Sequence, residues 1–547
     1  MLQEKILEKI QSYLLQEKEF SDLDFTKLNL SVPKNINHGD FSTNFALLNS
    51  STLRSKPLEL AEKMRKVIES NKDDFFDKIT IEKPGFINFV ISNKTYQSFL
   101  KEVSSLGSGF GSMQNNGTKV LLEFVSANPT GFLHLGHLRN AAVGDSISRI
   151  LSFTGYNVTK EYYLNDYGNQ IALLGESLKA RVFEKLGIDN QIPEGGYKGD
   201  YLIEIAELLV SKMGKESLLG EDLLFFSNFA VDYLREEIEI DLKELNIEFD
   251  TWFSERKQIH ESKYIAEIYN LLSSLNGSYS KDGASWIKTS EFGDNDDWVI
   301  KKSDNSSTYF MNDIAYHHNK FNRDYKVILN IWGADHHSHI SRLKASMRLL
   351  SNDLDKLQFV LIQFVRLVKD GEDVSMSKRS GTYITIKDML EEFNGDLVRF
   401  LMVSRSSDSH FDFDLDKCRE GSDENPIYYI QYANARINSI LKKYNSESFD
   451  IENVDLSLLN SEKEIALIKK ILDFPVVVRE ASSSLAPHKV AFYLQELASI
   501  FHGYYKITKV LVEDQSVSSA RISLLYSLRV VFANGLNLLG VSSPDRM

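Results

Sequence analysis

The chain has 547 residues and a formal net charge of −14, and its 42% hydrophobic and 26% charged residues are typical of an ordinary folded protein. This composition excludes a mainly disordered chain, and the small numbers of glycine (29) and proline (9) exclude collagen-like or proline-rich segments. The single cysteine, Cys418, allows neither an internal disulfide nor a cysteine-based zinc site, and no run of about 18 apolar residues suggests a membrane span. We therefore expect a cytoplasmic protein with roughly three or four domains.

The first region, residues 1–117, is predicted to be an α+β domain. Its opening stretch MLQEKILEKIQSYLL predicts an amphipathic helix, because Glu4 and Glu8 interrupt the apolar pattern and argue against a secretory signal. A strand-like stretch, IEKPGFINFVIS, follows further along the chain. The stretch GSGFGSMQNNGTK, rich in glycine, serine and asparagine, indicates a linker to the next region.

The second region, residues 118–424, alternates strand and helix patterns. The strand candidates are KVLLEFV, YNVTKEYYL, YKVILNIW and FVLIQFVRLV. Strands joined by helices predict a Rossmann-like parallel sheet of the α/β class, with ligands at the carboxyl ends of the strands. A helix-rich insertion is expected over about 176–298. The third region, residues 425–547, has amphipathic helical patterns almost throughout and is predicted to be an all-α helical bundle.

The stretch EFVSANPTGFLHLGH, residues 123–137, leaves the first strand of the second region and enters a helix. His134 and His137 are three residues apart and share a face of a helical turn, and Gly136 lets a ligand approach the backbone closely. A helix N-terminus offers free N–H groups and a positive dipole end, which favour a phosphate. Two unrelated surface histidines are the alternative, and a zinc pair lacks an obvious third ligand.

A second polar stretch, VSMSKRSGTY over residues 374–383, follows a strand candidate. It contains small hydroxyl residues together with Lys378, Arg379 and Gly381. A loop of this kind could close its lysine on a triphosphate. A solvated surface turn is the alternative.

HLGH and MSK together resemble the HIGH and KMSK signatures of the class I aminoacyl-tRNA synthetases, although Ser375 stands where that family has the first lysine of KMSK. Further segments narrow the resemblance to the arginyl-tRNA synthetase family. These segments are EYYLNDYGNQI, GGYKGDY, STYFMNDIAYH, WGADHHSHI, SRSSDSHFDFDLD, ENPIYYIQYANARI and LNLLGVSSPDRM, and HGDFSTNFA and KPGFINFVI extend the resemblance to the N-terminal region.

This resemblance implies that L-arginine is activated with ATP to arginyl-adenylate and pyrophosphate, and is then transferred to the 3′-terminal adenosine of tRNA(Arg) with release of AMP. His134, His137 and Lys378 are the implied catalytic residues, because they would stabilise the negative charge that builds on the phosphates. The ATP site is expected to consist of His134, Gly136, His137, Met376, Ser377 and Lys378. Mg²⁺ is expected to accompany ATP, and no structural zinc is expected.

The side chain of arginine is a planar cation, and carboxylates match it through paired hydrogen bonds. The resemblance makes Glu123 and Asp313 the guanidinium partners and Tyr309 the pocket tyrosine. Glu123 is otherwise an odd charge within KVLLEFV, whereas Asp313 could instead cap a helix and Tyr309 could be a core aromatic. The expected arginine-binding residues are Glu123, Ser126, Asn128, His137, Tyr309, Asp313 and His336.

The C-terminal helices resemble an anticodon-binding domain. Tyr429, Gln431, Tyr432 and Arg436 are expected to contact tRNA, because aromatic and arginine side chains stack on unpaired bases. Packing of Tyr429 and Tyr432 between helices is the alternative. The resemblance also implies a tRNA-contacting N-terminal domain, activation of arginine that needs bound tRNA, and no membrane partner. We expect a monomer.

Two other functions stay open at this point. A small-molecule nucleotidyltransferase with the same HxGH signature would need neither the long flanking regions nor a pocket for arginine. A non-catalytic tRNA-binding protein could keep a degenerate synthetase fold, but the joint presence of His134, His137 and Lys378 argues against it.

Overall fold

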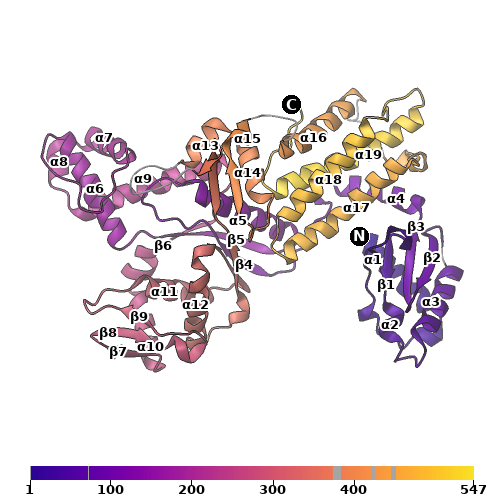
Figure 1. Ribbon diagram of the computed structural model, residues 1–547, viewed down its shortest axis with the longest axis horizontal. Coiled ribbons are helices and arrows are strands. Elements are labelled where there is room, and N and C mark those ends of the chain that lie inside the picture. Colours follow the sequence, from indigo (N-terminus) through magenta and orange to yellow (C-terminus); the bar gives the residue numbers. More distant parts are fainter. Residues whose placement is uncertain (1, 72, 374–383, 420–424, 445–450) are drawn as a thin grey trace.

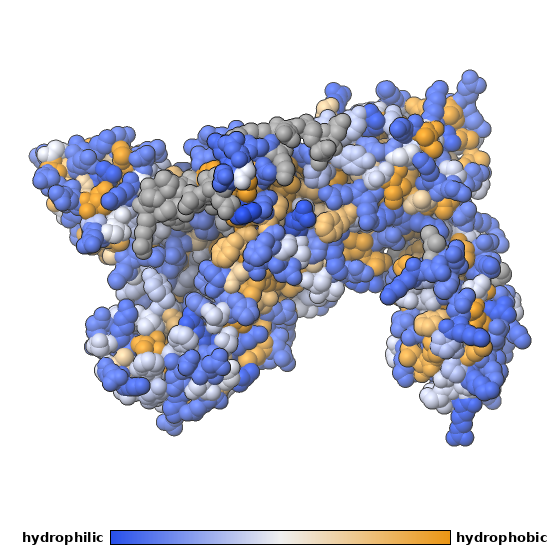
Figure 2. Space-filling view, viewed as in Figure 1, coloured by the Kyte–Doolittle hydropathy of each residue, from blue (hydrophilic) through white to orange (hydrophobic). Residues whose placement is uncertain are grey.

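The computed structural model describes residues 2–71, 73–373, 384–419, 425–444 and 451–547. Three bodies follow one another along the chain: an N-terminal unit, a central α/β body and a C-terminal group of long helices (Figure 1). The N-terminal unit and the part of the central body that holds residues 264–349 project from the same side of the molecule (Figure 1). The surface between these two projections is hollowed, so the molecule has an arched outline (Figure 2).

The N-terminal unit has the predicted α+β composition. Helix α1 (Leu2–Leu14) buries Leu2, Ile6, Ile10 and Leu14, which recur every four residues and so form one inward face. Its three strands form an antiparallel sheet of order β1-β3-β2. The other elements are β1 (Phe41–Thr43), α2 (Phe45–Asn49), α3 (Pro57–Asn71), β2 (Phe76–Glu82), β3 (Phe86–Ile91) and α4 (Asn93–Leu106).

Five parallel strands form the central sheet in the order β11-β10-β4-β5-β6. The strands are β4 (Lys119–Glu123), β5 (Asn157–Leu164), β6 (Thr251–Ser254), β10 (Val327–Gly333) and β11 (Leu357–Ile362). Helices join them, as parallel strands require, and these are α5 (Leu135–Phe153), α6 (Asn169–Lys185), α9 (Leu223–Glu244), α11 (Tyr309–Phe321) and α12 (His337–Leu349). The predicted Rossmann-like parallel sheet is therefore confirmed.

The range 176–298 differs from the predicted helix-rich insertion. It contains helices, but it also supplies the edge strand β6 to the central sheet and a separate antiparallel sheet of order β7-β8-β9. Its elements besides the end of α6, α9 and β6 are α7 (Tyr201–Met213), α8 (Lys215–Leu219), a π-helix (Arg256–Glu261), α10 (Tyr264–Ser274), β7 (Ser278–Lys281), β8 (Ala284–Ile287) and β9 (Trp298–Lys301). Strands of four residues carry too few alternations to be detected among helical patterns.

The stretch FVLIQFVRLV also differs from expectation, because it divides between two sheets. Its first half lies in β11, and its second half forms β12 (Val365–Lys369) in a small sheet of order β13-β12-β14. A continuous apolar run gives no signal for such a break. The remaining elements of the central body are β13 (Glu372–Asp373), α13 (Ile386–Glu392), α14 (Gly395–Val403), β14 (Phe411–Asp414) and α15 (Leu415–Arg419).

The C-terminal group consists of packed helices, as predicted. Its long helices are α16 (Pro426–Lys443), α17 (Glu462–Ser483), α18 (His488–Tyr505) and α19 (Gln515–Leu538). Over the ranges that the structure describes, none of the helices combines the length and the apolar character needed to cross a membrane.

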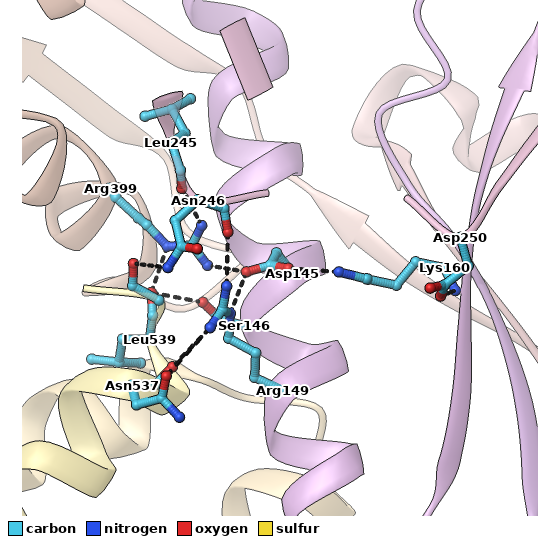
Figure 3. Close-up of polar contacts among 11 residues, drawn as sticks. Asp145, Ser146, Arg149, Lys160, Leu245, Asn246, Asp250, Arg399, Asn537 and Leu539 are labelled. Atoms are coloured by element: carbon cyan, nitrogen blue, oxygen red, sulfur yellow. Dashed lines mark hydrogen bonds and ion pairs between the residues drawn. The ribbon is translucent and has the colours of Figure 1, made fainter. Parts of the chain in front are cut away.

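The chain end ties these helices to the central body around a buried charge (Figure 3). Arg399 of α14 is buried and donates from Nε to the Leu539 carbonyl (2.6 Å), from Nη1 to the Leu245 carbonyl (2.7 Å), and from Nη2 to Asp145 of α5. Arg149 donates to the same carboxylate over 2.6 Å. Burial alone would raise the pKa of Asp145, but Arg399 and Arg149 hold it below its usual value. Helix α5, which begins at HLGH, is thus bonded to the end of the chain.

Candidate active site

The two histidines of HLGH form the N-terminal cap of α5. His134 is the N-cap residue, and its Nδ1 accepts the main-chain N–H of Gly136 over 3.1 Å. The Nδ1 of His137 accepts the main-chain N–H of His134 over 3.2 Å, so the pair makes a reciprocal capping box. The ring centroids lie 3.9 Å apart. Because each Nδ1 accepts a hydrogen bond, each neutral ring carries its proton on Nε2.

The segment between β4 and α5 is a tight, well-bonded turn. Val125 and Ser126 have φ values of 65° and 43°, a region that non-glycine residues rarely adopt. Asn140 of α5 holds this turn, because its side chain accepts the N–H of Val125 (2.7 Å) and donates to the Ile331 carbonyl at the end of β10 (3.0 Å). Strain of this kind is found at functional sites, where the surrounding structure fixes it.

The predicted phosphate loop, residues 374–383, lies entirely outside the described residues, and with it Met376, Ser377 and Lys378. Its C-terminal flank is described and lies against the HLGH turn. Thr385 forms an antiparallel bridge with His134, and the N–H of Ile386 donates to the Leu133 carbonyl over 2.9 Å. The chain that follows the MSK stretch therefore returns to the start of α5.

A buried carboxylate that the sequence did not identify, Glu255, stands directly after β6. Tyr163 donates to its Oε2 over 2.5 Å, and Asn312 donates to its Oε1 over 2.6 Å. His260 Nε2 lies 3.1 Å from the same Oε1. The signal for Glu255 was its place after a strand, but the strand itself was not predicted.

Asp313 lies in the second turn of α11, near Glu255 and Glu123. Thr308 is the N-cap of this helix, so the alternative that Asp313 caps a helix is wrong. Burial, together with the negative charges of Glu255 and Glu123, raises the pKa of Asp313 to about 7. Three carboxylates from three elements thus form one acidic pocket beyond the strand ends, which we call the acidic pocket (Glu123, Glu255 and Asp313).

Glu123 is the last residue of β4 and is buried at 5% exposure, which accounts for the charge within KVLLEFV. Its Oε2 accepts from the ammonium group of Lys320 on α11, and that group also donates to Asn330 over 2.6 Å. Glu123 therefore already has a cation of the protein as one partner.

Two further predicted residues lie in the turn after β4. The Ser126 hydroxyl accepts the main-chain N–H of Tyr163 over 3.1 Å, and the Asn128 amide donates to Gln170 over 2.9 Å. Both connect the β4 turn to the end of β5 and the start of α6. They therefore lie at the carboxyl edge of the sheet, as the sequence predicted.

Tyr309 opens α11 and is 55% exposed, so the alternative of a core aromatic is wrong. It lines a cavity of about 850 Å³ together with Asn312 and His260, two of the residues that bind Glu255. Tyr167 closes another side of the cavity and stacks on His260 with 3.7 Å between ring centroids. This cavity opens beside the acidic pocket and is large enough for an amino acid.

His336 lies just after β10, at the same edge of the sheet. Its side chain is half exposed, and its nearest ring neighbours are Trp332 and His339, at 5.7 Å and 5.1 Å between centroids. Asp335 lies 3.7 Å from it. A contact of His336 with arginine stays a prediction.

On α16, the predicted tRNA-binding residues divide between a partly exposed face and a buried one. Tyr428 is exposed and Tyr432 and Arg436 are partly exposed on this face, and with the partly exposed Tyr505 of α18 they form an aromatic stripe. The Arg436 guanidinium lies 4.5 Å from the Tyr432 ring centroid and 4.7 Å from that of Tyr505. Tyr428, which the sequence did not single out, is 41% exposed and parallel to Tyr432 within 8°.

Tyr429 and Gln431 face inward. The Tyr429 ring packs on His502 at 4.3 Å between centroids, and the Tyr432 ring also stacks on His502 at 5.9 Å, so both tyrosines pack between helices as in the alternative. Gln431 is 8% exposed, and its amide donates to Asp396 (2.8 Å) and to the Ser542 carbonyl (3.0 Å). The prediction that Gln431 contacts tRNA does not agree with this position, because its polar group is already used to hold the chain end.

The parts of the chain that the structure describes do not bring together the ligands that a metal ion needs. No three His, Cys, Asp or Glu side chains there are grouped so that they could hold a metal ion.

Comparison with known proteins places each region in the same family. The sequence matches the profiles of the arginyl tRNA synthetase N terminal domain over residues 1–91, the catalytic domain of tRNA synthetases class I (R) over 103–408, and the DALR anticodon binding domain over 430–547. It is 40% identical to an arginine–tRNA ligase of Staphylococcus epidermidis, over 99% of this chain and 100% of that protein, and 41% identical to one of Staphylococcus carnosus, over 95% of each.

Solved structures agree with this result. A structure titled as a putative arginyl tRNA synthetase from Campylobacter jejuni has a TM-score of 0.78 and 33% identity, and covers 84% of this chain and 100% of that one. An arginyl-tRNA synthetase of Thermus thermophilus shares the fold over the full length of both chains, with a TM-score of 0.75 at 22% identity. The chain therefore belongs to the arginyl-tRNA synthetase family of the class I aminoacyl-tRNA synthetases.

Proposed function

We propose that the protein is an arginine–tRNA ligase that forms arginyl-adenylate and pyrophosphate from L-arginine and ATP, and then transfers arginine to the 3′-terminal adenosine of tRNA(Arg). The observation that carries this proposal is the acidic pocket beside the histidine-capped N-terminus of α5. A guanidinium is always charged and needs carboxylates, whereas a triphosphate needs N–H donors and cations. The two sites adjoin at the carboxyl edge of one sheet.

In the first step, an oxygen of the arginine carboxylate attacks the α-phosphorus of ATP. The bond from that phosphorus to the bridging oxygen breaks, and pyrophosphate leaves with the electron pair. Negative charge grows on the phosphate oxygens, and the Nε2–H groups of His134 and His137 are the donors that would stabilise it. Removal of one such preorganised donor typically slows an enzyme about 100- to 1000-fold. Lys378 would add a positive charge, and Mg²⁺ would accompany the ATP as its counterion.

In the second step, a ribose hydroxyl of the terminal adenosine attacks the carbonyl carbon of the adenylate, and AMP leaves. The aromatic stripe on α16 and α18 supports this part of the proposal, because partly exposed rings with an arginine between them suit unpaired bases of an anticodon loop. We further propose that activation of arginine requires bound tRNA, and that the protein acts as a cytoplasmic monomer without structural zinc.

Domain boundaries belong to the same proposal. A tRNA-contacting domain over 1–117, a catalytic domain over 118–424 and an anticodon-binding domain over 425–547 agree in outline with the three matched family profiles. A small-molecule nucleotidyltransferase would need neither the first domain nor the last.

Arginine-dependent exchange between ATP and pyrophosphate tests the proposal directly. We expect exchange with arginine and a tRNA(Arg) transcript, and little without the tRNA. Citrulline, which has a neutral urea group in place of the guanidinium, is the matched control and should not support exchange, because the acidic pocket requires a cation. An absence of exchange with arginine and cognate tRNA would reject the proposed function.

A further inference from the structure

Two glutamates stand side by side in the central sheet. Glu123 of β4 is the register partner of Glu161 of β5 and also of Asn330 of β10, so the three side chains project from the same face in one row. Like charges on neighbouring strands repel each other, and both glutamates are buried. Each carboxylate therefore needs a cation. Lys320 of α11 supplies one, and Arg323, two residues after the end of that helix, supplies the other.

Glu161 is fully bonded. Arg323 donates from Nη1 to its Oε2 (2.5 Å) and from Nη2 to its Oε1 (2.9 Å), and the Tyr316 hydroxyl donates to Oε1 over 2.8 Å. Both oxygens accept hydrogen bonds from groups of the protein and Glu161 is 0% exposed, so a substrate does not reach this glutamate. Its role is structural.

Glu123 is bonded differently from its neighbour. Lys320 holds its Oε2, whereas Oε1 has no hydrogen-bond partner among the residues that the structure describes. The ammonium group of Lys320 is fixed from two other sides, by Asn330 at 2.6 Å and by the Tyr316 ring, whose centroid is 4.1 Å away. Lys320 is 0% exposed. Its cation is thus buried between the sheet and α11, and does not face the cavity.

A buried ion pair costs free energy, because both charges lose their hydration. Burial lowers the pKa of Lys320 below its ordinary value, although Glu123 opposes this effect. Such pairs contribute little net stability and in some proteins are kept because they impose specificity. The position of this pair suggests what it specifies. Asp313 lies seven residues before Lys320 on the same helix, hence on the same face, and the negative charge of Glu123 acts on it.

We propose that Lys320 is a positioning residue for substrate recognition: it holds one oxygen of Glu123, so that the carboxylate stays charged and presents its other oxygen, Oε1, to the guanidinium of arginine. This inference rests on the proposed function. Lys320 also balances one of the three negative charges of the acidic pocket and helps to lower the pKa of Asp313, so that less proton release is needed when the substrate cation binds.

The charged and titratable groups around this pair come from four elements and the residues that directly follow them. They are Glu161 of β5, Glu255 after β6, Asp313, Tyr316 and His317 of α11, Arg323 just after α11, and Arg342 of α12. Burial lowers the pKa of His317 well below its ordinary value, so His317 is neutral, and Tyr316 is neutral because burial raises its pKa. Loss of Lys320 would therefore leave the carboxylates to share the remaining cations, Arg323 and Arg342.

The test compares Lys320→Met with Arg323→Met in tRNA-supported pyrophosphate exchange. For Lys320→Met we expect the arginine KM at pH 7 to rise at least about 10-fold while the ATP KM changes less than about twofold. The arginine KM of this variant should fall more between pH 7 and pH 8.5 than that of wild type, because the acidic pocket with one cation fewer keeps the proton on Asp313 to a higher pH. Arg323→Met, which removes the cation of the fully bonded Glu161, should lower stability but leave the arginine KM within about threefold of wild type.

A double-mutant cycle covers the case in which Lys320→Met does not fold. The Glu123→Gln, Lys320→Met variant buries no unpaired charge. If Lys320 acts through Glu123, its arginine KM should equal that of Glu123→Gln alone within about twofold. A further increase, or a Lys320→Met enzyme with the wild-type arginine KM and pH profile, would overturn the inference. Both outcomes differ from failure of the proposed function, in which wild-type protein itself shows no exchange with arginine and tRNA.

Discussion

At the scale of single residues, the environment of each polar group fixes its protonation and hence its chemistry. Main-chain N–H groups hold Nδ1 of His134 and His137 as acceptors, which places the ring protons on Nε2. The pKa of Asp313 is raised, because burial and two neighbouring carboxylates disfavour its charged form. A bound guanidinium cation would favour the charged form of Asp313, so binding of arginine should release a proton.

This reasoning gives a pH dependence for arginine. Asp313 has a pKa of about 7, so it is mostly protonated at pH 6 and mostly ionised at pH 8, and only the ionised form attracts the guanidinium. We expect the arginine KM to fall about 10-fold between pH 6 and pH 8, in proportion to the ionised fraction. Asp313→Asn should raise the arginine KM at pH 8 by about 10- to 100-fold and remove this pH step. A wild-type KM that is flat over this range would contradict the assignment.

Apart from Asp313 and Tyr309, which the family resemblance supplied, residues of the pocket were predictable only where the sequence itself was anomalous. Glu123 was identifiable because a charge interrupts an apolar strand. Glu255 was not, since it follows a four-residue strand within a range of helical patterns. The pairing of Lys320 with Glu123 joins residues 197 positions apart, and no local pattern encodes such a contact.

At the scale of elements, one helix face often carries one function. Helix α16 carries Tyr428, Tyr432 and Arg436 at a spacing of four residues on its more exposed face, whereas Gln431 and its neighbours on the other face hold the chain end. Tyr505 of α18 completes the stripe from a second helix. Long helices with regular apolar spacing were therefore predictable, as the C-terminal group confirms. Which polar face is exposed depends on the neighbouring helices, and this explains why the sequence selected Gln431 and not Tyr428.

The stripe leads to a test by substitution of Tyr432. We expect Tyr432→Ala to weaken binding of tRNA(Arg) by about 5- to 150-fold, which corresponds to the loss of one stacked base, while the arginine and ATP KM values stay the same. Tyr526→Ala is the matched control, because Arg529 lies 4.5 Å from the Tyr526 ring on α19, outside the stripe. Filter binding at fixed salt measures both. Equal losses in the two variants would show that the stripe has no special role.

At the scale of the whole molecule, the chain end joins the helical group to the catalytic body. Asp396 at the start of α14 accepts the N–H of Ser542 over 3.0 Å. Arg399, about one turn further along α14, donates to the Leu539 carbonyl (Figure 3). Through Asp145 the same guanidinium reaches α5, whose first turn is the HLGH cap. These contacts link residues from 140 to 254 positions apart, so only the folded chain reveals them.

This junction can be tested with two glycines that have the same backbone conformation at a helix end but different neighbouring atoms. Gly540 follows α19 and Gly187 follows α6, with φ values of +68° and +74°. In both turns the glycine N–H bonds three residues back and the next N–H bonds five residues back. A Cβ at Gly187 would meet open space, whereas a Cβ at Gly540 would overlap the guanidinium of Arg399.

We therefore expect Gly540→Ala to be much more destabilising than Gly187→Ala. Both substitutions place alanine in the left-handed region, at a cost of about 1–2 kcal/mol. Only Gly540→Ala also displaces Arg399, and a buried cation separated from its partners costs a further 3–5 kcal/mol or so. In urea unfolding followed by tryptophan fluorescence, the urea concentration at the midpoint of the first unfolding transition should be clearly lower for Gly540→Ala than for Gly187→Ala. If the two midpoints coincide, Arg399 does not hold the chain end against α5, and the junction between the helices and the catalytic body must be sought in other contacts.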